Sequence, residues 1–395
     1  MSYGVFQEYF SGNWTLQGGV DAAGTIGTTS NGVMYLAMPF LFALFTRRWA
    51  HRRRTAALCG VGVASLGFLL SSFSTHVWHL VATQGVLAAL GCALVYSPTT
   101  LYLGEWFSSS DRAVAYGLVL SCKNIVGSAC PFLLRYLLER YGFPVTIRLW
   151  AAVATVSSIP AVFLIPPHPS SRIAAAHPSQ RRTPWHFLGH PTFYVFVVAT
   201  ALQSSGYGIP QTYLTTYAHD VTLLDANSAT LLLTLFNAPG IVASSFFGYL
   251  SDNKRLRLSA ATVTAIPSIG AALAAFLFWG PTAPGGMGLL TLFSITFGFF
   301  SGGYSATWGG VINELEREAA RNNEAIDSGL LYGLLNGARG VGYVAGGVSS
   351  VPLLKAGRVS AATSVGYGTA YGALIIFTGL SSALGGWGLI WKFLR

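Results

Sequence analysis

The sequence predicts an all-α protein that crosses a membrane many times, and three observations lead to this fold class. Only 9% of its 395 residues are charged, whereas a soluble domain carries roughly 25%. Hydrophobic residues make up 52% of the chain, and the mean hydropathy is +0.53. Apolar runs of spanning length recur along the chain. So few charges cannot cover a water-soluble surface of this size, and lipid is therefore the expected solvent for much of it.

Eleven apolar runs are long enough to be transmembrane helices, since a helix needs about 20 mostly apolar residues to cross the hydrocarbon core. Short polar joints separate them, as expected where irregular backbone must leave the hydrocarbon. The predicted spans are residues 24–46, 55–74, 78–103, 113–137, 145–166, 191–215, 228–250, 258–280, 286–310, 329–352 and 364–391.

The longest polar joint divides the predicted helices into five before it and six after it. This joint covers residues 167–190 and contains Arg172, Arg181 and Arg182. We therefore expect an N-terminal helical bundle over 1–166, a basic cytoplasmic linker, and a C-terminal six-helix bundle over 191–395.

The positions of lysine and arginine predict the orientation. Sixteen of them lie in one set of alternate loops and in the C-terminal tail: Arg47, Arg48, Arg52, Arg53, Arg54, Arg112, Arg172, Arg181, Arg182, Lys254, Arg255, Arg257, Arg317, Arg321, Lys392 and Arg395. The opposite side has four: Arg135, Arg140, Lys355 and Arg358. Because cytoplasmic loops are enriched in basic residues, the first side is predicted to be cytoplasmic, together with the C-terminus.

The two halves of the chain resemble each other. A basic hairpin follows the first predicted span at Arg47–Arg54 and the seventh at Ser251–Arg257. The segment Gly117–Lys123 also resembles Gly333–Arg339, because each begins with Gly-Leu and ends with a cation inside a span. Repeated halves are typical of secondary carriers, whose substrate site lies near the midplane where the halves meet.

Lys123 and Arg339 are the two cations predicted to lie near mid-span. Each lies about ten residues into its span, hence about 15 Å deep at 1.5 Å per residue. A charged side chain at that depth costs about 2.5 kcal/mol or more, and is usually tied to a substrate or ion pathway. The alternative is a structural anchor that bonds carbonyl groups of a neighbouring helix. The functional interpretation predicts that both cations bind an anionic substrate.

Polar and aromatic side chains inside the spans are further candidates: Gln203, Gln211, Tyr213, Asn237, Tyr304, Trp308 and Asn336. Interhelical hydrogen bonds are the ordinary role of such groups. Gln211 and Tyr213 stand out because they follow Pro210, which frees backbone groups and can break a helix near a site. The predicted substrate-binding set is Lys123, Arg339, Gln211, Tyr213, Asn237 and Asn336.

Several function classes are disfavoured. The four cysteines form no CxxC pair and no histidine cluster accompanies them, so neither a metal nor another cofactor is expected. No Walker motif and no nucleophile–base set lies in the spans, which argues against an ATP-driven pump and against an enzyme. The net charge of +10 resides in loops, which does not indicate nucleic-acid binding. The thirteen acids and eight histidines are peripheral, so coupling to a proton or another ion remains open without an assigned residue.

Several motifs together resemble the major facilitator superfamily, and within it the monocarboxylate porter family of fungal type. They are Gly104–Phe107 with Ala115–Gly117, Tyr141–Phe143 leading to Arg148, Ile209–Ala218, Asn237 with Gly248–Asp252, and Leu335–Gly340. The resemblance covers most of the chain. It implies a two-bundle fold of twelve spans with both termini in the cytoplasm.

The sequence departs from this family in three places. Gly4–Tyr9 is similar to the outer end of the family's first helix, so about eleven spans are expected and most of the first helix is absent from this sequence. After the second family helix Thr46 stands where an acid is usual, while Asp252 keeps that acid in the second half. The span around Asn237 lacks the acid–base pair of proton-coupled members.

The resemblance implies a secondary transporter that moves a small organic anion, monocarboxylate-like, or a related metabolite by alternating access. Its partners would be this substrate and the lipid bilayer, and the plasma membrane is favoured over vacuolar or other internal membranes. Two alternatives stay open: an exporter of a fungal secondary metabolite, and a non-transporting sensor or degenerate carrier.

Overall fold

The computed structural model describes residues 3–12, 17, 24–46, 49–107, 111–166, 185–252, 256, 258–357 and 365–394. Helices dominate these residues. In the first half they are α1 (Tyr3–Gly12), α2 (Gly24–Thr46), η2 (Ala50–Arg52), α3 (Arg53–Ser71), α4 (Val77–Leu80), η3 (Val81–Ala88), α5 (Ala89–Trp106) and α6 (Arg112–Leu164).

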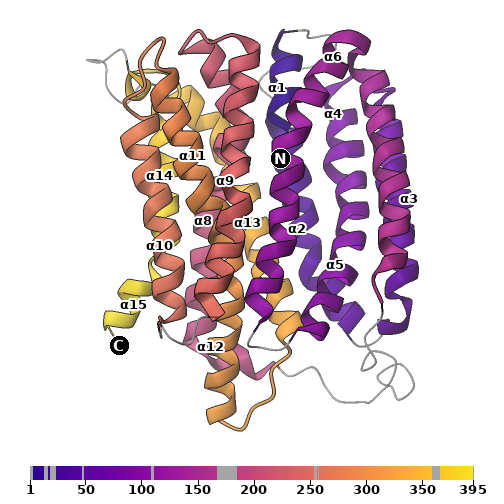
Figure 1. Cartoon of the computed structure of the whole chain (residues 1–395), viewed down its shortest axis with the longest axis vertical. Helices are drawn as coiled ribbons and strands as arrows, with labels where there is room; N and C mark the ends of the chain where they lie inside the picture. The colour runs from indigo at the N-terminus through magenta and orange to yellow at the C-terminus, as the bar shows by residue number, and fades with distance from the viewer. Residues whose placement is uncertain are drawn as a thin grey trace.

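The second half is also helical, and Figure 1 shows it beside the first. Its elements are η4 (His186–Gly189), α8 (Pro191–Asp220), α9 (Ala226–Asp252), α10 (Ala260–Ala274), η5 (Ala275–Trp279), α11 (Met287–Gly303), η6 (Tyr304–Thr307), α12 (Trp308–Arg321), α13 (Ser328–Ala356), η7 (Gly366–Gly368), α14 (Gly372–Leu384) and α15 (Gly388–Leu394). Most of the predicted linker, residues 167–184, lies outside the described part of the chain.

Each predicted span coincides with a helix or with a run of consecutive helices, and the prediction of 24–46 matches α2 at both ends. By length and composition, seven of the described helices can cross a membrane, or eight if α14 and α15, bent by 43°, form one span. Helices α8 and α13 have 30 and 29 residues and are therefore long enough. They do not pass this test because their apolar runs are interrupted by the polar groups discussed below.

Helix α6 contains two predicted spans. Its 53 residues would extend about 80 Å as one straight helix, more than twice a hydrocarbon core of about 30 Å. The chain turns at Gly142, whose φ of 74° is favourable only for glycine. Figure 1 shows α6 rising to one end of the molecule and descending again. We call residues 112–141 its first limb and residues 143–164 its second limb.

One segment between predicted spans is largely helical. The charged segment Glu314–Asp327 lies between the predicted spans 286–310 and 329–352, but α12 continues to Arg321. The reason is an apolar stripe at helical spacing, which buries Ile312, Leu315 and Ala319 against the bundle. The charged residues between them occupy the opposite face.

The two halves meet along two long seams. The first limb of α6 packs along α9, and α2 packs along α13. Glycines permit the close approach of these helices. A Cβ atom on Gly340 would lie 2.6 Å from the backbone nitrogen of Leu36. On the adjoining face of α13, a Cβ atom on Gly346 would lie 2.0 Å from the carbonyl oxygen of Ser205 in α8.

Side chains join the halves at the inner end, by which we mean the end that carries the C-terminus (bottom of Figure 1). Asp252 accepts a hydrogen bond of 3.0 Å from the backbone N–H of Val114, so it caps the start of α6 from the other half. Arg112 pairs with Glu316 at 2.7 Å. The acid that the second half retains at position 252 therefore acts as a helix cap across the seam.

The opposite, outer end is joined as well. Arg135 of the first limb of α6 forms an ion pair with Glu8 of α1. The same guanidinium donates hydrogen bonds to the carbonyl oxygen of Ala226 and to the hydroxyl of Thr230, both in α9. Both ends of this seam are therefore closed, and the mid-height of the molecule lies between them.

Candidate functional site

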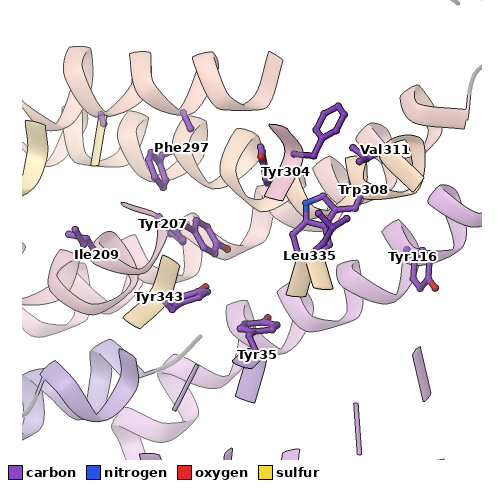
Figure 2. Packing of buried hydrophobic residues seen from close by; sticks show 14 of the residues in the cluster. Tyr35, Tyr116, Tyr207, Ile209, Phe297, Tyr304, Trp308, Val311, Leu335 and Tyr343 are labelled. Carbon is purple, nitrogen blue, oxygen red and sulfur yellow. The ribbon is translucent and has the colours of Figure 1, made fainter. Parts of the chain in front are cut away.

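Arg339 lies at mid-height on α13 and is only 5% exposed. Its guanidinium carbon lies over four aromatic rings, which we call the aromatic cage. The distances to the ring centroids are 4.9 Å for Tyr35, 5.4 Å for Tyr207, 5.7 Å for Tyr343 and 5.8 Å for Trp308. The rings come from α2, α8, α13 and α12, and Figure 2 shows them where helices of both halves meet.

Helical spacing brings the cage together. Tyr343 follows Arg339 by four residues and Tyr207 precedes Gln211 by four, so each pair shares one helix face. The Tyr343 hydroxyl donates a hydrogen bond of 3.4 Å to Oε1 of Gln211. The rings of Tyr35 and Tyr343 are stacked, with centroids 5.7 Å apart. The structure therefore places Gln211 beside Arg339, through Tyr343.

The charge of Arg339 is only partly compensated. Its guanidinium interacts with the Tyr343 hydroxyl, but its Nε has no hydrogen-bond partner among the described residues. No ion pair found in the described part of the chain includes Arg339. Each ring of the cage contributes about 0.5–2 kcal/mol of cation–π attraction. An arrangement of this kind stabilises a cation and leaves its Nε–H donor unused, so that an anion could pair with it.

Lys123 comes from the other half, on the first limb of α6, and is partly exposed. The next residue, Asn124, faces α9 and donates a hydrogen bond of 3.2 Å to the hydroxyl of Ser244, so Lys123 lies beside this seam. Its ammonium group is close enough to Arg339 for electrostatic repulsion between the two cations. The described residues offer Lys123 neither a hydrogen bond nor an ion pair. An anion between the two cations would relieve the repulsion.

The two asparagines have local hydrogen-bond partners. Asn237 donates to the carbonyl oxygen of Leu233 and Asn336 to that of Tyr332, both at 2.8 Å and both within their own helices. In each asparagine these bonds satisfy the NH₂ group of the buried side-chain amide and not its oxygen. Asn336 still precedes Arg339 by three residues on α13, so it borders the cage on the same helix face.

Tyr213 lies in a different layer. Its hydroxyl is 3.1 Å from the Ser350 hydroxyl, eleven residues beyond Arg339 on α13. It also adjoins Gly24, eleven residues before Tyr35 on α2. Eleven helical residues extend about 16 Å, so α13 and α2 place the Tyr213 hydroxyl about 16 Å along the helix axes from the level of Arg339 and Tyr35, toward the outer end. Of the six predicted residues, Arg339, Lys123, Gln211 and Asn336 lie together. Tyr213 lies toward the outer end, and Asn237 lies on α9 with its described hydrogen bond inside its own helix.

Three members of the cage were missed in the sequence: Tyr35, Tyr207 and Tyr343. The fourth, Trp308, was noticed only as a polar aromatic residue with an ordinary structural role. A signal existed for two of them, since Tyr343 and Tyr207 stand one helical turn from residues already selected. No comparable signal existed for Tyr35, because its place depends on how α2 packs against α13.

A separate hollow of about 660 Å³ opens at the inner end of the second half. Acidic and basic side chains both line it, including Asp252, Glu314, Arg317 and Lys392. Glu314 accepts a hydrogen bond of 3.1 Å from the backbone N–H of Ala260 at the start of α10. Asp252 and Glu314 thus serve as helix caps, which is the ordinary role of charges at a solvated helix end. We therefore place the candidate site at the cage.

Comparison with known proteins agrees with this architecture. A family model described as Major Facilitator Superfamily matches residues 13–347. An MFS-type transporter of Gibberella moniliformis is 26% identical over 354 residues, which cover 87% of this chain and 79% of the relative. Monocarboxylate transporter 12-B of Danio rerio is 28% identical over 290 residues, or 64% of this chain and 58% of that protein.

A solved structure has the same fold. The human organic anion transporter MFSD10 (TETRAN) superposes with a TM-score of 0.63 at 13% sequence identity, covering 98% of this chain and 89% of that one. At this identity the likeness concerns the fold alone. The described helices, the two seams and the family match agree in describing one kind of integral membrane protein. The chain belongs to the major facilitator superfamily, and it is a secondary transporter of small organic substrates, similar to monocarboxylate transporters, and not an enzyme.

Proposed function

We propose that the transported substrate is a small organic anion and that Arg339 binds its negatively charged group inside the aromatic cage. The observation that carries this proposal is a buried guanidinium without an ion pair in the described part of the chain. A carboxylate can accept two parallel hydrogen bonds from a guanidinium, including one from the free Nε. The rings of the cage would hold the guanidinium plane in place for this contact.

Lys123 is the second cation of the proposed site. Because it belongs to the first half and Arg339 to the second, one anion would attract both halves toward it. In alternating access the two halves rock about a site near the midplane. We propose that the contacts of Asp252 and Arg112 at the inner end, and of Arg135 at the outer end, break in turn. The substrate would then compensate the repulsion between the two cations whichever end is open.

The relatives support an anion by name only. One is called a monocarboxylate transporter and the structural neighbour is called an organic anion transporter.

We also propose a division into bundles at 1–166 and 191–395. We further propose a location in the plasma membrane, and imaging of a tagged chain can test this location. Coupling to a proton or another ion is likewise proposed, with no residue assigned to it. Abolition of substrate accumulation by a protonophore would identify a proton as the coupling ion.

The decisive experiment measures affinity and stability together. Purified protein and its Arg339→Gln and Lys123→Gln variants would be tested for binding of short carboxylates, with matched neutral amides and amines. We expect carboxylate affinity to fall at least tenfold in Arg339→Gln, because a buried charge-assisted hydrogen bond contributes about 1.5–3 kcal/mol. The matched control is Arg140→Gln, an exposed cation that also lies over tyrosine rings at the outer end. That control should retain the original affinity.

The alternative role of Arg339 predicts the opposite pattern. If the cation only holds helices together, Arg339→Gln will lower the melting temperature while carboxylate affinity stays unchanged. Tight binding of an amine that requires Arg339 would also contradict the proposal, since two cations disfavour a cationic substrate.

A further inference from the structure

Two tyrosine rings, one from each half, lie face to face between the aromatic cage and the inner end. Tyr116 belongs to the first limb of α6 and Tyr332 belongs to α13. Their ring centroids are 4.4 Å apart, and the ring planes are inclined by only 14°. Tyr116 is 4% exposed and Tyr332 is 1% exposed. We call these two residues the tyrosine pair, and neither of them belongs to the cage.

The internal repeat relates the two tyrosines to each other. The triplet Tyr-Gly-Leu occurs at Tyr116–Leu118 and again at Tyr332–Leu334. Tyr116 precedes Lys123 by seven residues, and Tyr332 precedes Arg339 by the same number. Seven helical residues extend about 10 Å, so the pair lies about 10 Å nearer the inner end than the two cations. Since repeated halves of a carrier are related by a pseudo-two-fold axis, equivalent residues that contact each other lie at this axis.

The tyrosine pair lies between two other contacts of the halves. Arg112 precedes Tyr116 by four residues, one helical turn nearer the inner end, and pairs with Glu316 at 2.7 Å. From the inner end to mid-height, the first half therefore meets the second in an ion pair, then in the tyrosine pair, and then at the cage. In alternating access, the route from a midplane site to one side of the membrane opens between the halves. The tyrosine pair thus lies across the route between Arg339 and the inner side.

Tyr332 is enclosed by side chains of the opposite half. Besides Tyr116, its ring has Phe42 of α2 as a neighbour, with centroids 6.1 Å apart. Its hydroxyl is 3.5 Å from the hydroxyl of Tyr96 on α5. From its own half, Trp308 of the cage meets the ring edge to face at 5.6 Å. Separation of the halves at the inner end would therefore remove the first-half partners of Tyr332 and leave it beside the cage.

From this arrangement we infer that the tyrosine pair is the inner gate of the transporter: it closes the route between the cage and the inner side, and its separation opens that route. A stacked pair suits this role because two rings can part without breaking an ionic bond, while aromatic pairs still attract each other beyond their buried area. The inference rests on the proposed site at the cage for the position of the route, and it does not depend on the charge of the substrate.

The test measures access to the cage from the inner side with a single cysteine. Asn336 lies one helical turn beyond Tyr332 on the cage side and is 1% exposed. Asn336→Cys is therefore the reporter, in a full chain whose four native cysteines are replaced by alanine. Membrane vesicles with the inner face outward are treated with a charged, membrane-impermeant thiol reagent. We expect Tyr116→Ala to raise the labelling rate at least tenfold, and Tyr116→Phe, which keeps the ring, to change it less than twofold.

Three controls accompany this measurement. Tyr136→Ala is the matched variant, because Tyr136 lies on the same limb of α6 but is 53% exposed, and it should leave the rate unchanged. Tyr116→Leu is a second gate variant for use if the alanine variant does not fold, and it should also raise the rate because it lacks a flat ring. Vesicles of the opposite orientation are the third control. Loss of the inner gate favours the inward-facing state, so labelling of the same cysteine from the outer side should not rise.

The outcomes separate this inference from the anion site. An unchanged rate in Tyr116→Ala and Tyr116→Leu would overturn the inner gate. Faster labelling from both sides, or an equal increase in Tyr136→Ala, would also overturn it, since either pattern indicates general loosening of the helices. No substrate enters the assay, so these results are independent of carboxylate binding. Loss of carboxylate affinity in Arg339→Gln beside an unchanged labelling rate would overturn the gate alone, and a gate that behaves as expected without carboxylate binding would overturn the anion site alone.

Discussion

Lys123 and Arg339 occupy matching positions of the internal repeat, yet their surroundings differ. Arg339 is buried and lies over four aromatic rings. Lys123 is partly exposed and has no aromatic ring over it among the described residues. The difference follows from the neighbours: α8 and α12 bring rings to Arg339, and α2 brings a third ring from the other half. Equivalent sequence positions thus acquire different chemistry from the helices that pack around them.

The inner end shows a second asymmetry between the halves. Asp252 caps α6 across the seam. At the matching position Thr46 lies by the start of α13, near Gly329, but its hydroxyl has no described hydrogen-bond partner. Helix α13 is capped from its own chain instead, by Asp327, which accepts a 3.0 Å hydrogen bond from the Leu330 N–H. One seam is therefore joined by a helix cap at this end and the other is not.

The largest expected effect contrasts a close helix contact with an exposed surface. Gly346→Ala would place a methyl group 2.0 Å from the carbonyl oxygen of Ser205 in α8, and we expect a loss of about 2–3 kcal/mol of stability. Gly62→Ala is the control, since no atom lies within 4 Å of a Cβ there, and alanine favours a helix by about 0.5–1 kcal/mol. Melting temperatures in detergent would report both changes. A similar melting temperature for the two variants would mean that the contact between α13 and α8 is loosely packed.

A smaller effect should distinguish the two cations. Arg339→Lys keeps the charge but loses the planar group that stacks on aromatic rings and forms paired hydrogen bonds. We expect carboxylate affinity to fall about tenfold, or 1.4 kcal/mol. Lys123→Arg should change affinity less than threefold, because no ring lies over that position to select a shape. Equal effects in a binding assay would show that the cage does not set the difference between the sites.

The smallest effects concern the inner end. Asp252→Ala should cost about 1 kcal/mol by removing a cap and should speed labelling of a cysteine introduced at the seam nearby. Thr46→Asp should stabilise the start of α13 by about 0.3–1 kcal/mol, because a carboxylate favours a helix N-terminus. Labelling that is slower in Thr46→Asp and faster in Asp252→Ala would support the conclusion that a helix cap joins only one of the two seams at this end. An unchanged rate in both would mean that these residues do not govern opening at this end.

Several features could be predicted from residues alone because they depend on local composition. Apolar length determines where helices cross, so the predicted spans agree with the helices. The rarity of cations inside apolar runs identified Arg339 and Lys123 as candidates, and the structure places them in different halves, close enough to interact. The family resemblance singled out Asp252 as a retained acid. Each of these signals lies within a few turns of one helix.

Other features depend on which helices pack together, and the sequence does not contain that information locally. Tyr35 reaches Arg339 only because glycines let α2 approach α13 closely. Tyr213 was grouped with Gln211 by their proximity in sequence, but a separation along the helix axis assigns it to another layer. The helical extension of α12 arises because its apolar stripe finds the bundle.

What the sequence by itself determined is therefore the membrane-spanning helical class, the internal repeat and the rare charges within it, because hydrophobic length and charge cost act on single helices. What only the tertiary structure decided is the aromatic cage around Arg339. A cage needs rings from four helices at one height. It is a consequence of packing between distant segments, which no local pattern specifies.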